Sequence, residues 1–330
     1  MREPAFWWRS AGLASGLLSP AAAIYGAIAS ARMARAGHSP GVPVVCIGNL
    51  TVGGAGKTPA AIMVAQWLAA AGRRPFLLSR GYGGASAGPV RVDPARHTAD
   101  EVGDEPLLLA RAAPTIVSRD RPAGAEAACE AGAGSIVMDD GFQNPTLAKK
   151  LSIVVVDNRR GIGNGWVFPA GPLRAPLAAQ LNRAHAVLLI GEGPGGEPVA
   201  AAARRRRLPV FHGRLEPDAA ALAALRGRPV LAFAGIADPE KFFATLRDGG
   251  VDVRAALPFP DHHRYRRSDA LALARRAERE GLSLVTTEKD LARLAGRIEL
   301  TPLASARALP VTLAVTEQRV LQDFVLARIG

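Results

Sequence analysis

A glycine-rich segment, Thr51–Thr58, follows the apolar run Val44–Ile47 and precedes a segment with helical character, Pro59–Ala71. Backbone N–H groups of such a turn converge on phosphate oxygens, its lysine reaches the β- and γ-phosphates, and its threonine hydroxyl ligates magnesium. The helix that follows would direct the positive end of its dipole at the same anion. Because strand, loop and helix occur in this order, the segment predicts a site for a nucleoside triphosphate at a sheet edge.

This loop supplies the expected nucleotide site, and it departs from the usual pattern at its first position, where Thr51 replaces glycine. Lys57 is also a candidate catalytic group, because it can neutralise the phosphoryl group during transfer. The alternative, a surface turn that happens to contain Gly-Lys-Thr, fits the flanking strand and helix less well. The residues expected around the phosphates are Thr51, Val52, Gly53, Gly54, Ala55, Gly56, Lys57 and Thr58.

Apolar runs alternate with alanine-rich, helix-favouring segments over most of the chain, which indicates an α/β fold. The runs are continuous, as in strands that are buried on both faces of a parallel sheet. Strands are expected at 75–79, 115–118, 135–138, 151–156 and 185–190, and a second α/β segment has runs at 229–236, 251–253 and 283–287. We expect a P-loop NTPase-type parallel sheet with flanking helices (36–215), a smaller C-terminal α/β domain (216–330) and an apolar N-terminal helical segment (1–35).

Two adjacent acids, Asp139 and Asp140, follow the apolar run 135–138. In a phosphate-loop fold an acid at this strand end can complete the magnesium coordination that Thr58 begins. Acids at strand ends also form turns, so the pair by itself is a weaker indication. With the loop, the sequence predicts a nucleoside triphosphate and Mg²⁺ as ligands, with Thr58, Asp139 and Asp140 at the metal.

A third acid, Asp104, lies just before the helix-favouring run 107–112. Acids at a helix start stabilise the dipole, which is one explanation for this residue. The other is that Asp104 activates an attacking hydroxyl, a task for which a carboxylate needs an orienting partner such as histidine. His262 and His263 offer that partner, although an isolated His-His pair can also be structural.

The N-terminal segment carries no charged side chain between Arg9 and Arg32. That stretch is long enough to span a bilayer, but its alanines, glycines, serines and Pro20 make insertion weak. We expect a helical hairpin or amphipathic helix that lies on a membrane, with Trp7 and Trp8 at the interface. A helix packed on the protein's own core is the alternative.

Basic residues exceed acidic ones, giving a net charge of +12, so the chain should be attracted to anions. Aromatic residues make up 5% of the chain, too few for a stacking platform on single strands, and no recognition motif accompanies the charge. We therefore expect no nucleic-acid partner. The run Arg204–Arg207 could bind phosphate or lipid headgroups, or form a solvated helix face.

The motifs, taken in order, resemble one family, the tetraacyldisaccharide 4'-kinases (lipid A 4'-kinases), over nearly the whole chain. Each motif alone is weak, but their order is specific. They are Gly48–Pro59, Ser79–Gly84, Val102–Pro106, Asp139–Gln143, Gly163–Gly165, Pro169–Arg174, Phe259–His262 and Thr286–Asp290.

The resemblance implies ATP-dependent phosphorylation of the 4'-hydroxyl of a tetraacylated glucosamine disaccharide 1-phosphate, a step of lipid A biosynthesis. It implies an enzyme at the cytoplasmic face of the bacterial inner membrane, peripheral or anchored by its N-terminus. It also implies that an aspartate–histidine pair activates the hydroxyl, which maps to Asp104 and His262. Members typically carry an acid after Pro-Leu-Arg, where this chain has Ala175, so any metal or nucleotide contact from that side chain is missing or replaced.

A substrate that already bears phosphate suits arginine, which makes bidentate phosphate contacts. Arg80, Arg119 and Arg121 follow strand ends on the expected active edge and are the predicted substrate-binding residues. Asp120 lies between two of them and can neutralise one. The alternative function is a membrane-associated P-loop ATPase switch of the partitioning or metallochaperone type, which needs no hydroxyl acceptor.

Overall fold

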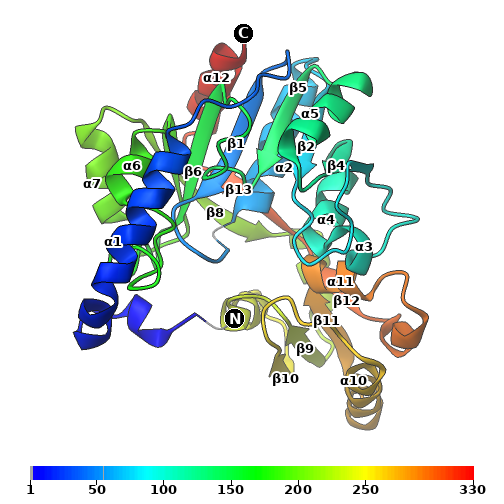
Figure 1. The fold of residues 1–330 in the computed structure, drawn as a ribbon. Coiled ribbons are helices and arrows are strands. Elements are labelled where there is room, and N and C mark those ends of the chain that lie inside the picture. Colours follow the sequence, from blue (N-terminus) through cyan, green and yellow to red (C-terminus); the bar gives the residue numbers. More distant parts are fainter. Residues whose placement is uncertain (1–2, 55) are drawn as a thin grey trace.

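The computed structural model describes residues 3–54 and 56–330, and its largest element is a nine-stranded sheet (Figure 1). The strand order is β13-β8-β7-β6-β1-β5-β2-β4-β3; strands β8 to β4 run parallel, and the strand at each edge is antiparallel to its neighbour. The strands are β1 (Val44–Asn49), β2 (Pro75–Ser79), β3 (Val90–Arg91), β4 (Thr115–Val117), β5 (Ser135–Asp139), β6 (Leu151–Asp157), β7 (Ala186–Ile190), β8 (Val210–Pro217) and β13 (Val311–Val315).

Helices cover both faces of this sheet, which explains why its strands are apolar without alternation. In β1, Val44 and Cys46 pack into one apolar cluster, whereas Val45 and Ile47 pack into another on the opposite face. The first cluster includes residues of α1 (Leu13–Met33), α5 (Arg121–Glu130), α6 (Leu177–Leu181) and α7 (Glu197–Arg205). The second includes residues of α2 (Lys57–Ala70), α4 (Asp104–Ala112) and α12 (Gln318–Ile329).

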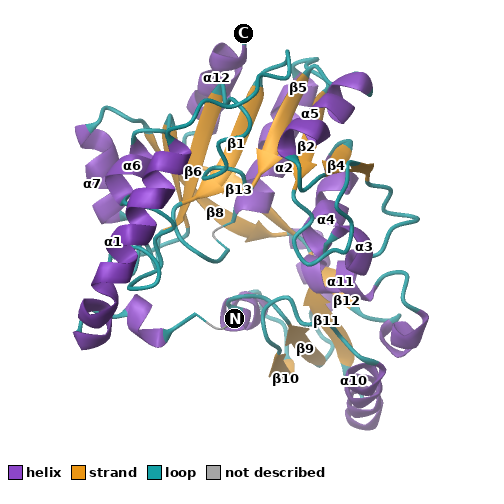
Figure 2. Cartoon of the chain, viewed as in Figure 1, coloured by secondary structure: helices purple, strands orange, loops and turns teal. Residues whose placement is uncertain are grey.

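A smaller four-stranded parallel sheet, of order β10-β9-β11-β12, forms the C-terminal part (Figure 2). Its two apolar clusters also lie on opposite faces, so both expected α/β regions are confirmed. Its elements are α8 (Ala219–Leu225), β9 (Val230–Ala234), α9 (Pro239–Asp248), β10 (Val253–Pro258), α10 (Arg267–Glu280), β11 (Ser283–Thr287), α11 (Glu288–Leu294), η2 (Ile298–Leu303) and β12 (Arg307–Leu309). A short α3 (Ala99–Val102) precedes α4 in the first part.

The last segment of the chain returns to the large sheet. β13 pairs antiparallel with β8, and Leu321, Val325 and Ile329 of α12 join the apolar cluster of α2. The division at 36–215 and 216–330 stays a proposal, and this pairing favours ending the second part near residue 310. Pairing between strands so far apart leaves no signal in the local sequence.

The N-terminal segment, η1 (Ala5–Trp8) and α1, packs against residues 162–176 on one side. Trp7 is buried and donates from Nε1 to the carbonyl of Pro169 at 3.0 Å. Asn164 donates from its backbone N–H to the carbonyl of Trp7 at 2.8 Å and from Nδ2 to Oγ of Ser15 at 2.9 Å. The placement of Trp7 at a membrane interface is therefore wrong, because its ring packs inside the protein.

The other side of α1 is apolar and exposed. Leu17 and Ile24 expose 83% and 65% of their surface, and Leu13 and Ile28 are also exposed. By length and composition α1 could cross a membrane, with a mean hydropathy of 1.4, although such a helix is weak evidence by itself. One side of α1 thus packs on the protein's own core, and the exposed apolar side is the one that suits the expected contact with a membrane.

Candidate active site

The phosphate loop lies between β1 and α2, at the carboxyl end of the large sheet. Gly53 and Gly56 adopt φ values of +103° and +81°, which side chains rarely allow. Asn49 donates from Nδ2 to the Gly53 carbonyl at 2.8 Å, and Lys57 donates from Nζ to the same carbonyl at 3.2 Å. The buried lysine is thus held over the loop. Ala55 lies outside the described residues.

Thr51 is explained by its pairing with a distant loop. It forms an antiparallel bridge with Leu173, and Val52 donates its N–H to the carbonyl of Pro172 at 2.8 Å. Arg174 donates its N–H to the carbonyl of Leu50 at 2.9 Å. Because Thr51 has extended pairing and no positive φ, glycine is not needed there.

Asp139 lies beside the phosphate loop and has an unsatisfied oxygen. Thr58 donates from Oγ1 to Oδ2 of Asp139 at 3.1 Å, whereas Oδ1 is buried without a hydrogen-bond partner. Burial first, then the charge of Glu105, raises the pKa of Asp139 to about 7. A buried carboxylate oxygen next to a hydroxyl is a donor set that fits Mg²⁺, which takes few protein ligands beside phosphate oxygens. Among the described residues no group of three or more His, Cys, Asp or Glu side chains could hold a metal alone.

Asp140 has a left-handed backbone conformation and pairs with two cations. Its φ is +52°, and its carboxylate accepts from Nη1 of Arg174 at 2.8 Å and from Nη2 at 3.3 Å. Nζ of Lys57 lies 3.8 Å from Oδ2. Burial alone would raise the pKa of Asp140, but Lys57 and Arg174 outweigh it and lower the pKa to about 2. Asp140 is therefore an anion that orders Lys57 and Arg174 before nucleotide binds.

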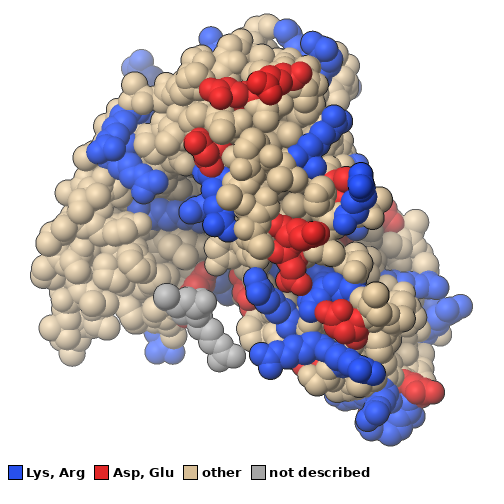
Figure 3. Space-filling model, turned by 45° about the vertical axis from the view of Figure 1, so that its right-hand side comes forward, with Lys and Arg blue, Asp and Glu red and all other residues tan. Residues whose placement is uncertain are grey.

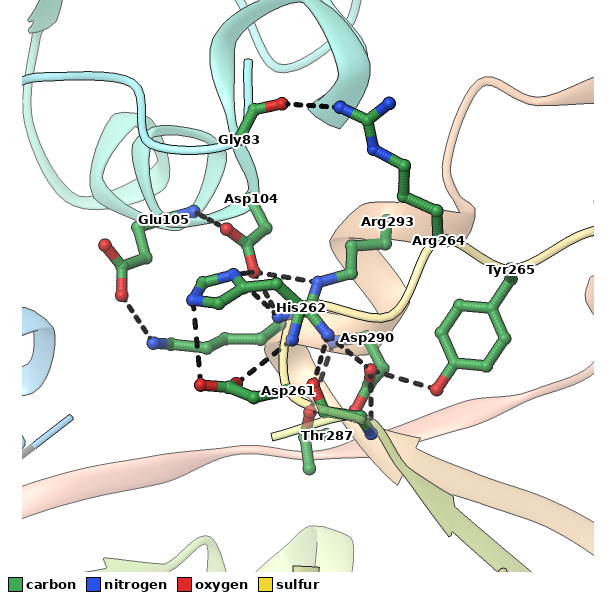
Figure 4. A network of polar contacts seen from close by, with 12 residues as sticks. Gly83, Asp104, Glu105, Asp261, His262, Arg264, Tyr265, Thr287, Asp290 and Arg293 are labelled. Carbon is green, nitrogen blue, oxygen red and sulfur yellow. Dashed lines mark hydrogen bonds and ion pairs between the residues drawn. The ribbon is translucent and has the colours of Figure 1, made fainter. Parts of the chain in front are cut away.

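The second half of the site joins α4 to the loop after β10 (Figure 4). Oδ2 of Asp104, the first residue of α4, lies 3.4 Å from Nδ1 of His262, which adopts a φ of +54°. The carboxylate is 5% exposed and the imidazole 31% exposed. Burial opposes ionisation of Asp104, but the His262 hydrogen bond and the Arg293 charge hold its pKa well below the usual range. The Asp104 hydrogen bond raises the pKa of His262.

The structure brings His262, and not His263, to Asp104. Nε2 of His263 lies 3.0 Å from Oδ2 of Asp269 on α10. The ring of His262 packs instead against Tyr82, with ring centroids 5.1 Å apart.

Arg293 of α11 completes this network, and the sequence argument missed it. Its Nε donates to Oδ2 of Asp104 at 2.8 Å, and its Nη1 donates to Oδ1 of Asp290 at 2.8 Å. The motif Thr286–Asp290 was the available signal, because an arginine three residues after Asp290 shares its helix face. Its role becomes visible only when α11 packs against α4.

The sequence profile of the family described as tetraacyldisaccharide-1-P 4'-kinase matches residues 14–330. The chain belongs to this family.

Relatives of this kinase family match along their whole lengths. A tetraacyldisaccharide 4'-kinase of Rhodopseudomonas palustris is 56% identical over 330 residues, covering 100% of this chain and 96% of the relative. One of Methylobacterium nodulans is 58% identical over 318 residues, covering 96% and 93%. A crystal structure of LpxK from Aquifex aeolicus in complex with ATP matches with a TM-score of 0.71 and 26% identity, covering 96% and 99%. The expected family, fold class and kinase assignment are confirmed, and the ATPase switch is not favoured.

The three arginines predicted to bind substrate occupy different environments in this kinase. Arg80 and Arg119 are exposed, and Nη2 of Arg119 donates to the carbonyls of Gly84 and Ala85 at 3.2 and 3.3 Å. Arg121 is 2% exposed and donates from Nη2 to the carbonyls of Asp139 and Asp140 at 3.4 and 3.3 Å. This position favours support of the two acids over direct substrate contact; the substrate roles stay predictions.

Two other sequence features have structural explanations. Asp120 caps α5 by accepting the N–H of Ala123 at 3.3 Å, so its expected pairing with a neighbouring arginine is not needed. Ala175 is fully buried in an apolar cluster, and its methyl group offers no metal contact.

Replacing Tyr265 by phenylalanine should destabilise the C-terminal sheet. The buried hydroxyl donates to Oδ1 of Asp290 at 3.0 Å. We expect the free energy of unfolding in urea to fall by about 1.5 kcal/mol, because Asp290 keeps its other donors. Tyr82→Phe, at an exposed side chain, is the control and should stay near wild type. Equal losses in both variants would contradict this role.

Proposed function

We propose that this chain transfers the γ-phosphoryl group of ATP to the 4'-hydroxyl of a tetraacylated glucosamine disaccharide 1-phosphate. The carrying observation is that the phosphate loop and the Asp104–His262 pair lie at one edge of the sheet. Lys289 of α11 is near both: its Nζ donates to Oε1 of Glu105, next to Asp104, at 2.6 Å, and the carboxylates of Asp104 and Asp139 both raise its pKa. The names of the relatives and the ATP of the Aquifex structure support the choice of substrates.

Lys57 and the loop N–H groups would hold the triphosphate. Thr58, Asp139 and Asp140 would hold Mg²⁺, which neutralises phosphate charge when bound. These assignments rest on the unpartnered oxygen of Asp139 and on the position of the phosphate loop between strand β1 and helix α2.

The Asp104–His262 pair would accept the hydroxyl proton as the new O–P bond forms. His262 is the more exposed member, so its Nε2 meets the hydroxyl, and Asp104 orients the ring through Nδ1. Since Asp104 raises the pKa of His262 above its ordinary value of 6.5, the rate should fall as pH drops through that raised pKa. The proton leaves the hydroxyl oxygen, and ADP leaves with the electron pair of the broken P–O bond.

The transfer is tested with purified protein, magnesium and γ-labelled ATP on the lipid disaccharide monophosphate in detergent. Label should enter the lipid, and mass spectrometry should find one added phosphate on the sugar that lacks the 1-phosphate. ATP hydrolysis without a phosphorylated lipid would reject the proposal.

The membrane is the second proposed partner, with the protein at the cytoplasmic face of the bacterial inner membrane. The exposed side of α1 supplies apolar contact, and Arg9, Arg32 and Arg35 lie near its ends, where lipid phosphates would be. Figure 3 shows Lys and Arg side chains around the central hollow and over the lower right of the view, while the lower left carries few charged side chains. Together with the exposed apolar side chains of α1, this pattern supports one docking side and a basic approach for an anionic lipid.

Charging α1 should release the protein from membranes. Each apolar side chain that enters lipid contributes about 1.5–3 kcal/mol, so Leu17→Asp with Ile24→Asp should weaken vesicle binding at least about 10²-fold. Sedimentation with anionic vesicles measures this. Val320→Asp on α12, where the side chain is 63% exposed, is the control. Unchanged sedimentation of the α1 variant would place the anchor elsewhere.

A further inference from the structure

Helix α11 directs two cations at α4 across the boundary between the two sheets. Lys289 pairs with Glu105 and Arg293 with Asp104, the first two residues of α4 being acids. Positions 289 and 293 are one helical turn apart and share a face. The two ion pairs therefore join the first part, which carries the residue that orients His262, to the C-terminal part.

Every nitrogen of the buried Arg293 guanidinium is engaged. Nε and Nη2 both donate to Oδ2 of Asp104, and Nη1 donates to the carbonyl of Gly235 at 2.6 Å and to Asp290. Nη2 also lies 3.4 Å from Nδ1 of His262. The fork geometry of arginine allows these contacts at once, and lysine could not reproduce them.

Asp290 is fixed from the other side. Both its carboxylate oxygens accept the N–H of Gly235 at 3.1 Å, and Oγ1 of Thr287 donates to Oδ2 at 2.7 Å. With the Tyr265 hydroxyl, these donors anchor the carboxylate to the ends of β9 and β11. Arg293 therefore extends from the firmly held carboxylate of Asp290 to the carboxylate of Asp104 on another part of the chain.

We propose that Arg293 is a positioning residue for the Asp104–His262 pair, holding the carboxylate against the imidazole and keeping the pair ready to accept a proton. This proposal rests on the proposed function. The residues of the motif Thr286–Asp290 then act through Arg293, because they hold its side chain in place.

The positive charge of Arg293 affects both the proton positions and the pKa of His262. The Asp104 carboxylate only accepts, so Nδ1 of His262 carries the proton and donates it to Asp104. Nη2 of Arg293 then lies beside Nδ1 without donating to it, and Nε2, 3.9 Å from Oδ2 of Asp261, is the ring nitrogen that accepts a proton. The positive charge opposes a second positive charge on the ring and so lowers the pKa of His262, while Asp104 and Asp261 raise it. The other charged groups facing the pair are Glu105, Lys289 and Asp290.

Three variants of the full-length enzyme separate positioning from simple support. Arg293→Gln should lower kcat about 10²-fold, as expected for a misplaced catalytic group, with KM for ATP and lipid near wild type. Its acid limb of kcat against pH should move to higher pH. Arg293→Lys keeps the charge, so its limb should return toward wild type while kcat stays reduced.

Arg297→Gln is the matched control. Arg297 also crosses to the first part, with Nε 3.6 Å from Asp100, but it does not contact the catalytic pair. We expect wild-type kcat and pH dependence. Equal effects of the two glutamine variants, or an Arg293→Gln loss without a shift of the acid limb, would overturn the proposal.

Two further outcomes are decided in advance. If Arg293→Gln does not fold, Arg293→Lys decides alone: reduced kcat with unchanged KM supports positioning, and wild-type kcat overturns it. If the wild-type protein transfers no phosphate while it binds ATP, the proposed function fails instead, which is a distinct result.

Discussion

Replacing Asp104 by asparagine is expected to lower kcat for phosphoryl transfer by about 10³–10⁴-fold, the loss seen when the acid that orients a catalytic histidine becomes an amide. The amide would no longer fix the Nδ1 proton of His262, and it would leave Arg293 with a weaker partner. ATP binding, measured by calorimetry, should stay close to wild type, because no hydrogen bond or ion pair joins Asp104 to the described residues of the phosphate loop. Label transfer to lipid measures the loss.

The control for this substitution is Asp100→Asn. Asp100 is a partly exposed acid of α3 that pairs with Arg297 and lies outside the catalytic pair. Its variant should transfer phosphate at the wild-type rate. Parallel loss of ATP binding and transfer in Asp104→Asn would contradict the role of Asp104 and favour a nucleotide switch.

Replacing Lys57 by methionine should reduce kcat/KM for ATP by about 10²–10³-fold, as for loss of one preorganised donor to a developing negative charge. The buried ammonium group lies 3.8 Å from Asp140 and 3.2 Å from the Gly53 carbonyl, poised over the loop. Removing it also leaves Arg174 and Arg121 as the remaining cations near Asp140. Initial rates over a range of ATP concentrations measure the effect.

Lys150→Met is the matched control for Lys57, because Lys150 is exposed next to β6. It should bind ATP and transfer phosphate normally. A Lys57 variant with unchanged kcat/KM would remove Lys57 from the catalytic set.

The sequence predicted the elements whose burial is local and complete. The runs at 75–79, 135–138 and 283–287 lie within strands β2, β5 and β11, because both faces of a parallel strand need apolar residues. β8 and β13 escaped prediction, since these half-buried strands, of which β13 forms the sheet edge, pair with each other across 93 intervening residues, 218–310. Their pattern is too weak to read without the partner.

The site followed the same division. The loop residues and Asp139 carry their chemistry in a short motif, so they could be named in advance. Arg293 could not, because its function depends on α11 meeting α4. The expectation for Trp7 failed for a related reason: an amphipathic tryptophan suits a lipid interface and a protein interior equally, and the loop at 164–169 decides between them.

The loop at 164–174 binds α1 at one end, through Asn164 and Ser15, and the phosphate loop at the other, through Leu173 and Thr51. Helix α1, the proposed membrane anchor, and the phosphate loop, the proposed ATP site, therefore move as a single body. If α1 lies in the headgroup layer, as we propose, the γ-phosphate of bound ATP would stand at a set height above the acyl chains. We expect this height to select the acceptor: a sugar hydroxyl would be phosphorylated when its distance from the lipid tails matches the height of the γ-phosphate.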